Sequence, residues 1–483
     1  MIFICQKKLI ASLLMLGINA AVMAQTTPNP LPALKAARWH EATREILLEA
    51  RENDPNEPML PKEMAFDGFT SDALDSARML CRACQSAALV TVVSAPSSMS
   101  VEEKEHILNE ALAILRSGSR EPVWSTDTLT NAALIYSDLG LKAQAHSIFD
   151  EAITSATSDP ASPSDFDRAA FALANAAPGG VPDWMVSSLE EATRRWPPSA
   201  DTALAYRDLA IIRFQKSQPT AALDLMDKAL GACSSIANKG QAQAIRASVG
   251  RLALDSNQLD FARHRIPAPL IIDAYASFEA RNGNKDAALD FLQELPGPTL
   301  YVDVRDETLS QIIRDASNRG DFSTAKFFAG KIDPQKTHMQ IELWTYIARE
   351  EHLKGDLKAS EEDFRRILNI VDVMPIEQRQ SLISEKGVLA EAMAKSEMSA
   401  ESLRLSRSNK TSALMLSERQ KAMNLDGLLS LAKAFHVAGD ESEAKETLTM
   451  AYQIAHDYQP PNQYATTKSQ LLMKVASTAA AFQ

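Results

Sequence analysis

Two short motifs place a serine and a lysine at the spacing that serine acyl-transferases use. The segments Ser323-Thr-Ala-Lys326 and Ser442-Glu-Ala-Lys445 both read SxxK, an arrangement in which a lysine can assist a serine nucleophile. A catalytic nucleophile normally occurs once in a chain, whereas these two motifs occupy the same position of an internal repeat. We therefore interpret both as parts of the repeat pattern and expect no acyl transfer from them.

Other patterns that mark enzymes and metal sites are missing from the sequence. It contains no GxxxxGK[ST], GxGxxG, GxSxG or HExxH, and the segment that begins His40-Glu41 has Arg44 where a zinc motif needs histidine. The carboxylates stand in short scattered runs that are typical of solvated helix faces. We expect neither an enzyme nor a cofactor, and we assign no metal site.

One further candidate for chemistry is a CxxC motif formed by Cys81 and Cys84. Gln85 stands where the attachment of a c-type haem requires histidine, and zinc would need a second pair of ligands. The motif lies within a helical pattern and does not follow a strand. We expect either a local disulfide between Cys81 and Cys84 or two buried thiols, and a redox role is the alternative.

The first 24 residues have the pattern of a secretory signal peptide. Lys7 and Lys8 precede an apolar core over Leu9–Ile18, and small residues at Val22 and Ala24 suit a signal peptidase. A membrane anchor is the alternative, but the apolar run is shorter than the ~20 residues that a spanning helix needs. We expect cleavage after Ala24 and an exported protein, periplasmic or secreted, with no membrane span in the mature chain.

The composition narrows the class of protein further. The chain has 483 residues, of which 45% are hydrophobic and 23% are charged, a globular balance that excludes disorder and a multi-span membrane protein. It carries 62 acidic against 50 basic residues, a net charge of −12. General nucleic-acid binding needs clustered basic residues, so we do not expect a nucleic-acid partner.

Apolar residues recur at three- and four-residue steps almost throughout, which predicts amphipathic helices. A self-comparison shows a repeated segment of the form Gly-Asp-x-x-x-Ala, as in Gly320 to Ala325. The glycine suits the left-handed end of one helix, the Asp or Asn caps the next, and the Ala lets the two helices approach closely. Clear copies begin at Gly140, Gly283, Gly320, Gly355 and Gly439, and weaker copies at Ser217, Asn257 and Ser396.

These anchors resemble the tetratricopeptide repeat family. The resemblance covers roughly residues 124 to 458, with departures at Glu351, where the family has an aromatic residue, and at Ser360, where it has Ala. It implies an all-α fold, a right-handed α/α superhelical solenoid of helix-turn-helix repeats. The residues that would pack the repeats are Ala133, Tyr136, Gly140, Ala145, Gly283, Gly320, Trp344, Gly355, Gly439 and Ala444.

The predicted chain has four parts: a signal peptide over 1–24, non-repeat helices that cap the amino end over 25–120, the repeats over 121–458 and a closing helix within 459–483. Stacked helix pairs of this kind make a solenoid in which each pair buries one side against its neighbours. We expect an open, curved slab whose hollow side does the recognising.

Basic residues recur on the first helix of the repeats, and the resemblance places them in the concave groove. This row of cations, which we call the basic ladder, could bind acidic side chains or the terminal carboxylate of a peptide through charge-assisted hydrogen bonds. The alternative is ordinary solvated cations that contribute little. The candidates are Arg251, Arg314, Arg349 and Lys433 six residues before the Gly position, His352 and His436 three before it, and Arg207 and Lys386 ten before it.

The sequence therefore predicts an exported scaffold that binds protein or peptide partners, acidic ones among them, in the groove of a helical solenoid. An alternative is the helical scaffold of a cell-envelope enzyme, such as a hydrolase or lyase that acts on the cell wall, or an accessory subunit to one. That alternative requires a compact non-repeat domain with an essential acid, and the repeat pattern leaves little room for one.

Overall fold

The computed structural model describes residues 28–117, 122–157, 164–175, 180–296, 303–375, 382–416, 418–460 and 466–483. The predicted signal peptide lies outside these ranges. The described residues form 26 α-helices, one short 3-10 helix (η1, Ala268–Leu270) and no strand. The all-α prediction is confirmed.

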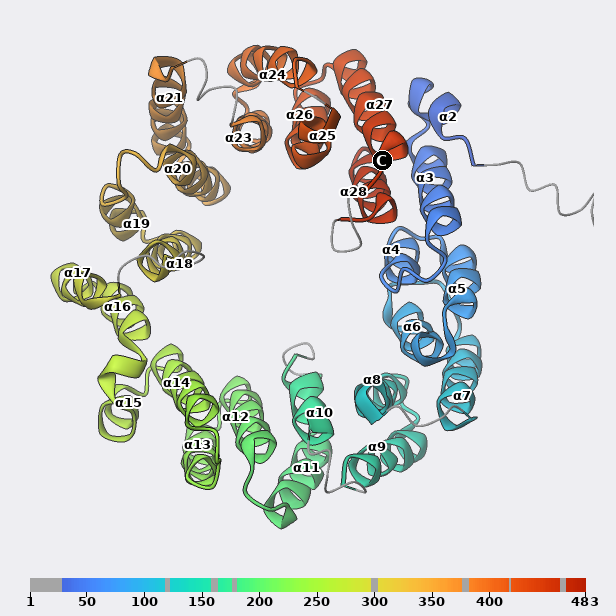
Figure 1. The fold of residues 1–483 in the computed structure, drawn as a ribbon, viewed down its shortest axis with the longest axis vertical. Coiled ribbons are helices and arrows are strands. Elements are labelled where there is room, and N and C mark those ends of the chain that lie inside the picture. The colour runs from blue at the N-terminus through green and yellow to red at the C-terminus, as the bar shows by residue number, and fades with distance from the viewer. Residues whose placement is uncertain are drawn as a thin grey trace, which may run out of the picture.

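The helices form two concentric layers that Figure 1 shows in cross-section. The inner layer consists of α4 (Leu60–Phe66), α6 (Arg82–Ser94), α8 (Pro122–Asp138), α10 (Ser164–Ala174), α12 (Ala200–Gln215), α14 (Lys239–Asp255), α16 (Ile272–Arg281), α18 (Val304–Arg319), α20 (Thr337–Leu353), α23 (Ile383–Lys395), α26 (Leu425–Val437) and α28 (Lys468–Ala480). Each inner helix contacts the next one around the layer.

Every inner helix has an outer partner, so the described helices make twelve inner–outer pairs. The outer layer consists of α3 (Trp39–Asn53), α5 (Thr70–Met79), α7 (Val101–Ser117), α9 (Lys142–Thr157), α11 (Asp183–Arg195), α13 (Pro219–Cys233), α15 (Leu259–Arg265), α17 (Lys285–Glu294), α19 (Phe322–Ala329), α21 (Leu357–Val373), α24 (Ser399–Leu414) and α27 (Glu441–Asp457). Two short helices, α2 (Leu31–Lys35) and α25 (Glu418–Met423), lie outside this scheme.

The turns between paired helices follow the repeat pattern. Gly320 ends α18 with a φ of 81°, a left-handed conformation that a Cβ would strain, and the Asp321 side chain caps α19 by accepting from the Thr324 N–H. The weaker copies at Ser217 and Asn257 adopt the same positive φ. The remaining weak copy is displaced by one residue, because the positive φ falls on Glu397 and not on Ser396.

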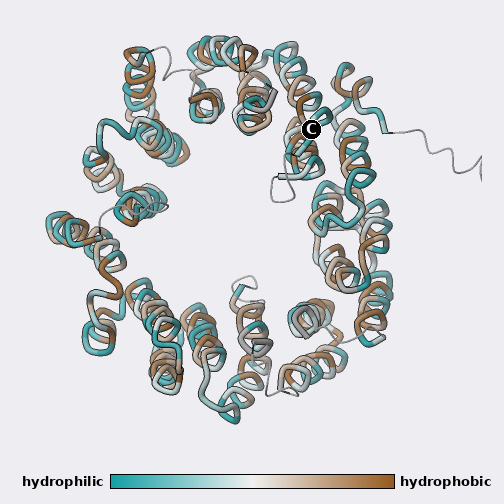
Figure 2. The backbone as a smooth tube through the Cα atoms, viewed as in Figure 1, coloured by the Kyte–Doolittle hydropathy of each residue, from teal (hydrophilic) through white to brown (hydrophobic). Residues whose placement is uncertain are grey.

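Small residues at the pair interfaces allow the close packing that the pattern predicts. Ala145, Ala325 and Ala444, each five residues after the turn glycine, are fully buried. Tyr136 and Trp344 are buried at the aromatic and large apolar positions. Figure 2 shows hydrophobic and hydrophilic residues alternating along each helix, as expected for amphipathic helices packed in two layers.

The solenoid closes into a ring, and the expectation of an open slab was wrong. The last helix, α28, packs along the first long helix, α3, and completes the twelfth pair with one member from each end of the chain (Figure 1). It also contacts α26 and α4, so the inner layer is continuous. Twelve pairs close a circle when each turns the next by about 30°, because small rotations per repeat accumulate along a solenoid.

The closing contacts form a seam that joins polar and aromatic side chains from both chain ends. Glu49 of α3 is 5% exposed and accepts a hydrogen bond of 2.7 Å from the Tyr452 hydroxyl of α27. The Nδ1 atom of His456 lies 2.7 Å from the same carboxylate, and Lys468 Nζ lies 3.4 Å from it. The Phe482 ring contacts that of Trp39 edge-on, with centroids 5.1 Å apart.

Candidate binding surface inside the ring

The predicted basic ladder lies on the inner layer, and two of its members pair with the neighbouring inner helix. Arg251 of α14 makes two hydrogen bonds, of 3.0 and 3.3 Å, to the carboxylate of Asp273 on α16. Arg314 of α18 lies 2.5 Å from Glu342 of α20. Each of these two cations therefore already has a carboxylate partner, and the two pairs tie adjacent repeats together.

Arg314 and Arg349 converge on one aromatic ring. The guanidinium carbon of each arginine lies 4.7 Å from the centroid of Tyr346, which stands between them. The Tyr346 hydroxyl donates a hydrogen bond of 2.7 Å to Asn318 Oδ1, which fixes the ring. Stacking of this kind holds a guanidinium in place while leaving its N–H groups able to bind an anion.

This cluster lines a cavity of about 420 Å³ between α18, α20 and α23. The cavity combines three cations with three carboxylates, so it favours a ligand of mixed charge over a polyanion. The Oγ1 atom of Thr345, a residue that is 3% exposed, has no hydrogen-bond partner among the described residues. The lining residues are Arg314, Glu342, Thr345, Tyr346, Arg349, Ser384, Glu385, Val388, Glu391, Ala392 and Lys395.

Lys386 does not join this surface, and its predicted place in the groove was wrong. Its side chain is buried, with only 4% of the residue exposed. Lys386 lies on α23, which packs closely on α26: a Cβ on the adjacent Gly387 would lie 2.5 Å from the carbonyl oxygen of Gly427.

Three other predicted groove residues, Arg207, His352 and His436, do not line this cavity. Arg207 binds the neighbouring Asp208 at 2.6 Å, and burial raises the pKa of that carboxyl despite the arginine. His352 is half-buried at the end of α20. His436 stacks on Phe482 with centroids 4.4 Å apart, and its Nδ1 lies 2.7 Å from Glu441, so it belongs to the seam and not to an open groove.

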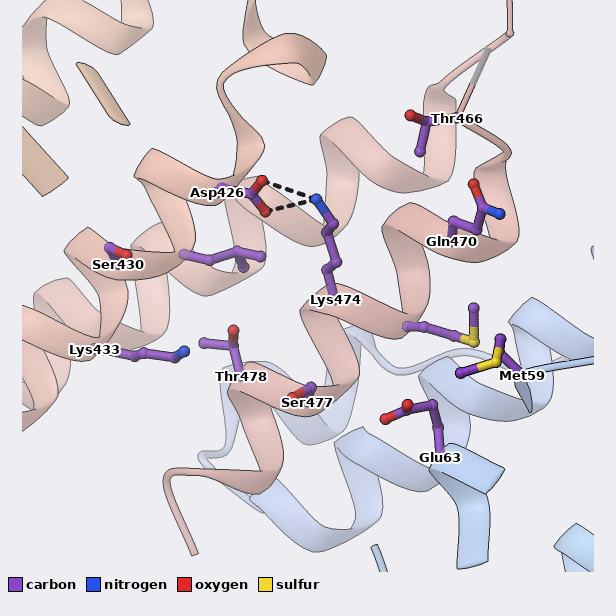
Figure 3. Close-up of a pocket in the computed structure, with 12 residues that line it drawn as sticks. Met59, Glu63, Asp426, Ser430, Lys433, Thr466, Gln470, Lys474, Ser477 and Thr478 are labelled. Atoms are coloured by element: carbon purple, nitrogen blue, oxygen red, sulfur yellow. Dashed lines mark hydrogen bonds and ion pairs between the residues drawn. The ribbon is translucent and has the colours of Figure 1, made fainter. Parts of the chain in front are cut away.

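Lys433 lines a second cavity of about 610 Å³ on the inner side of the seam. Figure 3 shows α26 and α28 on one side of it and the amino-terminal α4 on the other. Lys474 and Asp426 form an ion pair of 2.8 Å at one edge, while Lys433 and Glu63 carry opposite charges at separate places on the wall. A ligand bound here would contact both ends of the chain.

In the first SxxK motif, the serine and the lysine bind different partners. Lys326 Nζ lies between two buried carboxylates, 2.6 Å from Glu351 and 2.7 Å from Asp363, and the Ser323 hydroxyl accepts instead from Lys285. Burial raises the pKa of Glu351 to about 7, although Lys326 acts in the opposite direction. Glu351, which stands where the repeat family has an aromatic residue, is thus a buried partner of Lys326.

The CxxC motif begins α6. Cys81 is the residue just before the helix and is exposed, whereas Cys84 in the first turn is half-buried. Their sulfur atoms lie 3.0 Å apart, in contact but farther than the ~2.05 Å of a disulfide. Among the residues that the structure describes, no three His, Cys, Asp or Glu side chains lie close enough together to hold a metal ion.

Sequence reasoning missed two parts of these surfaces. Tyr346 stands three residues before Arg349, on the same helix face, and that spacing could have indicated the stack. The contacts of Glu49 with Tyr452 and His456 leave no comparable signal in the sequence, because both partners lie more than 400 residues away along the chain.

Comparisons with known proteins give matches only among solved structures. No protein-family model matches the sequence, and no curated protein matches it significantly. Among solved structures, a monomeric IFIT1 mutant with Gppp-AAAA matches at 15% identity and a TM-score of 0.25, covering 85% of this chain and 99% of that one. A circular tandem repeat protein with a novel repeat topology matches at 13% identity and a TM-score of 0.18, covering 89% and 93%.

The protein is an all-α helical repeat protein built from paired helices. Its distinguishing features are the closed ring and the two cavities on the inner layer. None of the helices in the described ranges combines the length and apolarity that crossing a bilayer requires.

Proposed function

We propose that this protein is an exported scaffold that binds a peptide segment of a partner protein on the inner surface of its ring. The observation that carries the proposal is the convergence of Arg314, Tyr346 and Arg349 on one cavity of about 420 Å³. The three side chains come from two adjacent inner helices. They form an anchor at which an acidic side chain or a chain-terminal carboxylate can bind.

The charges around the anchor define the kind of segment that fits. An incoming carboxylate can replace Glu342 on the guanidinium of Arg314, while Glu385 and Glu391 can accept from a basic group of the same peptide. Because an aromatic ring already orders both guanidinium groups, little side-chain entropy is lost on binding. The anchor therefore selects peptides in which acidic and basic residues alternate.

Closure of the ring restricts how a partner can enter. A continuous inner layer offers no open side, so a bound segment must come along the axis of the ring as a chain end or as a hairpin. A free carboxyl terminus meets this requirement and also supplies the anion that the two arginines can bind. We therefore propose chain ends with mixed charge as the preferred ligands.

The test is binding of a fluorescent peptide library, with free and amidated carboxyl termini, to the full-length protein. The double variant Arg314→Glu and Arg349→Glu should weaken binding of the tightest peptides at least tenfold. The control combines Lys358→Glu and Arg365→Glu, which makes the same change of charge on the exposed face of the outer helix α21. Equal binding by the double variant and the control would refute the anchor.

Export rests on the sequence of the first 24 residues and needs its own test. Expressed in a bacterium with its full leader, the protein should reach the periplasm with Gln25 as its first residue. Mass spectrometry of the intact protein after fractionation measures this directly. A full-length chain in the cytoplasm would contradict the proposal, and replacing Leu13 and Leu14 with Arg should produce that outcome deliberately.

A further inference from the structure

The turn between α5 and α6 places two sulfur atoms in contact. Cys81 Sγ lies 3.0 Å from Cys84 Sγ, so a small shift of either side chain would bring them to bonding distance. The backbone geometry that holds them is regular, since the N–H groups of Cys84 and Gln85 both bond the Cys81 carbonyl at the start of the helix.

The two cysteines differ in their access to solvent. Cys81 is exposed at the amino end of α6, where an external disulfide can reach its sulfur. Cys84 is half-buried in the first turn, behind it. This order suits a reaction in which Cys81 attacks an external disulfide and Cys84 then attacks Cys81.

A structural role explains the pair poorly. A disulfide between residues three apart would close a loop of only four residues, and the gain in stability from a cross-link falls as the loop shortens. The surrounding helices are already held by a continuous apolar core that includes Leu80 and Leu89. The third described cysteine, Cys233, is buried in α13, and burial raises the pKa of its thiol.

We infer that Cys81 and Cys84 form a thiol–disulfide exchange site whose substrates are exposed disulfides of proteins or small molecules. The Cys81 thiolate attacks one sulfur of the substrate, forms a mixed disulfide and releases the other sulfur as a thiolate. Cys84, after losing its proton, attacks Cys81 and releases the second thiolate. The protein gains one disulfide and loses two protons, and the two electrons reduce the substrate to two thiols.

The experiment uses the full-length protein, reduced and freed of reductant, with oxidised glutathione as the probe and peptide mass spectrometry as the readout. The native chain should form the Cys81–Cys84 disulfide and release two molecules of glutathione, with no adduct remaining. Cys84→Ser should instead keep one glutathione on Cys81. Cys81→Ser should react at Cys84 at least tenfold more slowly, and Cys233 in the same sample serves as the buried control.

Two results would overturn the inference. Stable glutathione adducts on the native chain at Cys81 or Cys84, or equal rates in the two serine variants, would show that the pair does not act in sequence. A Cys81–Cys84 disulfide that reduced glutathione cannot open would show a structural bond. Circular dichroism of each variant confirms that the helices are retained, so a failure to react can be assigned to the cysteines.

Discussion

Replacing Glu49 with Ala should weaken the closure of the ring without unfolding the repeats. Glu49 belongs to α3, and its carboxylate is the shared acceptor for groups on α27 and α28. The substitution leaves the hydroxyl of Tyr452, a residue that is 3% exposed, without its acceptor at 2.7 Å. It also removes the charge that faces His456 and Lys468.

The expected loss follows from these contacts. A buried hydrogen bond to a charged group contributes about 1.5–3 kcal/mol. The pair with His456 adds little, because the histidine side chain is 44% exposed and solvent screens it. We therefore expect Glu49→Ala to destabilise the seam by about 2–3 kcal/mol. Tyr452→Phe, which removes only the hydroxyl, should cost about 1–1.5 kcal/mol, and the two losses should not add.

Amide hydrogen exchange followed by mass spectrometry can locate this effect. If the seam opens locally, exchange in α3 and α28 should rise about 30-fold to 160-fold for a loss of 2–3 kcal/mol. Exchange in α14, which lies across the ring from the seam, should stay unchanged. Unchanged exchange at the seam, or an equal rise in α14, would refute the reasoning.

Further predictions concern single buried or capping positions. Burial raises the pKa of Glu351 from 4.5 to about 7, so the folded state binds the proton of this carboxyl more tightly than the unfolded state does. The free energy of unfolding should therefore fall by up to about 3 kcal/mol as the pH rises from 4.5 to 7. Urea titrations of Glu351→Gln should show no such dependence on pH. Gly427→Ala should lower the free energy of unfolding by about 2 kcal/mol or more, because the new Cβ would lie 2.8 Å from the Ser384 Cα. Gly231→Ala should raise it slightly, because the space around this helical glycine is open. Ser100→Ala should cost about 1 kcal/mol in thermal unfolding, because it removes the hydroxyl that accepts a hydrogen bond from the Glu103 N–H and caps α7, while the bond from the Ser100 N–H to the Glu103 carboxylate is kept.

The repeats could be predicted because each turn is specified by a few neighbouring residues. Gly140, Gly283 and Gly439 all adopt a positive φ, as the pattern indicates. The capping aspartates, including Asp440, accept the expected backbone N–H. Such features depend on local geometry alone, and a single sequence records them.

Ring closure could not be predicted, because it depends on the sum of many small rotations between pairs. A change of a few degrees per pair would move α28 far from α3, and no local motif fixes that angle. The contacts that seal the ring, such as Ser469 to the carbonyl of Ala50, join residues at opposite ends of the sequence.

Only part of the candidate site could be predicted, because some of its contacts do not follow the spacing of the repeats. Helical spacing placed Arg314 and Arg349 on one surface, but their carboxylate partners come at irregular distances along the chain. Lys386 shows the opposite error. Its position in the repeat suits a groove residue, but its side chain is buried.

The central claim is that the first and last helices close the twelve pairs into a ring, and electron microscopy of single particles tests it most directly. Images of the full-length protein viewed along the axis should show an unbroken ring with an open centre. Particles that are arcs with a gap between α3 and α28 would contradict the account.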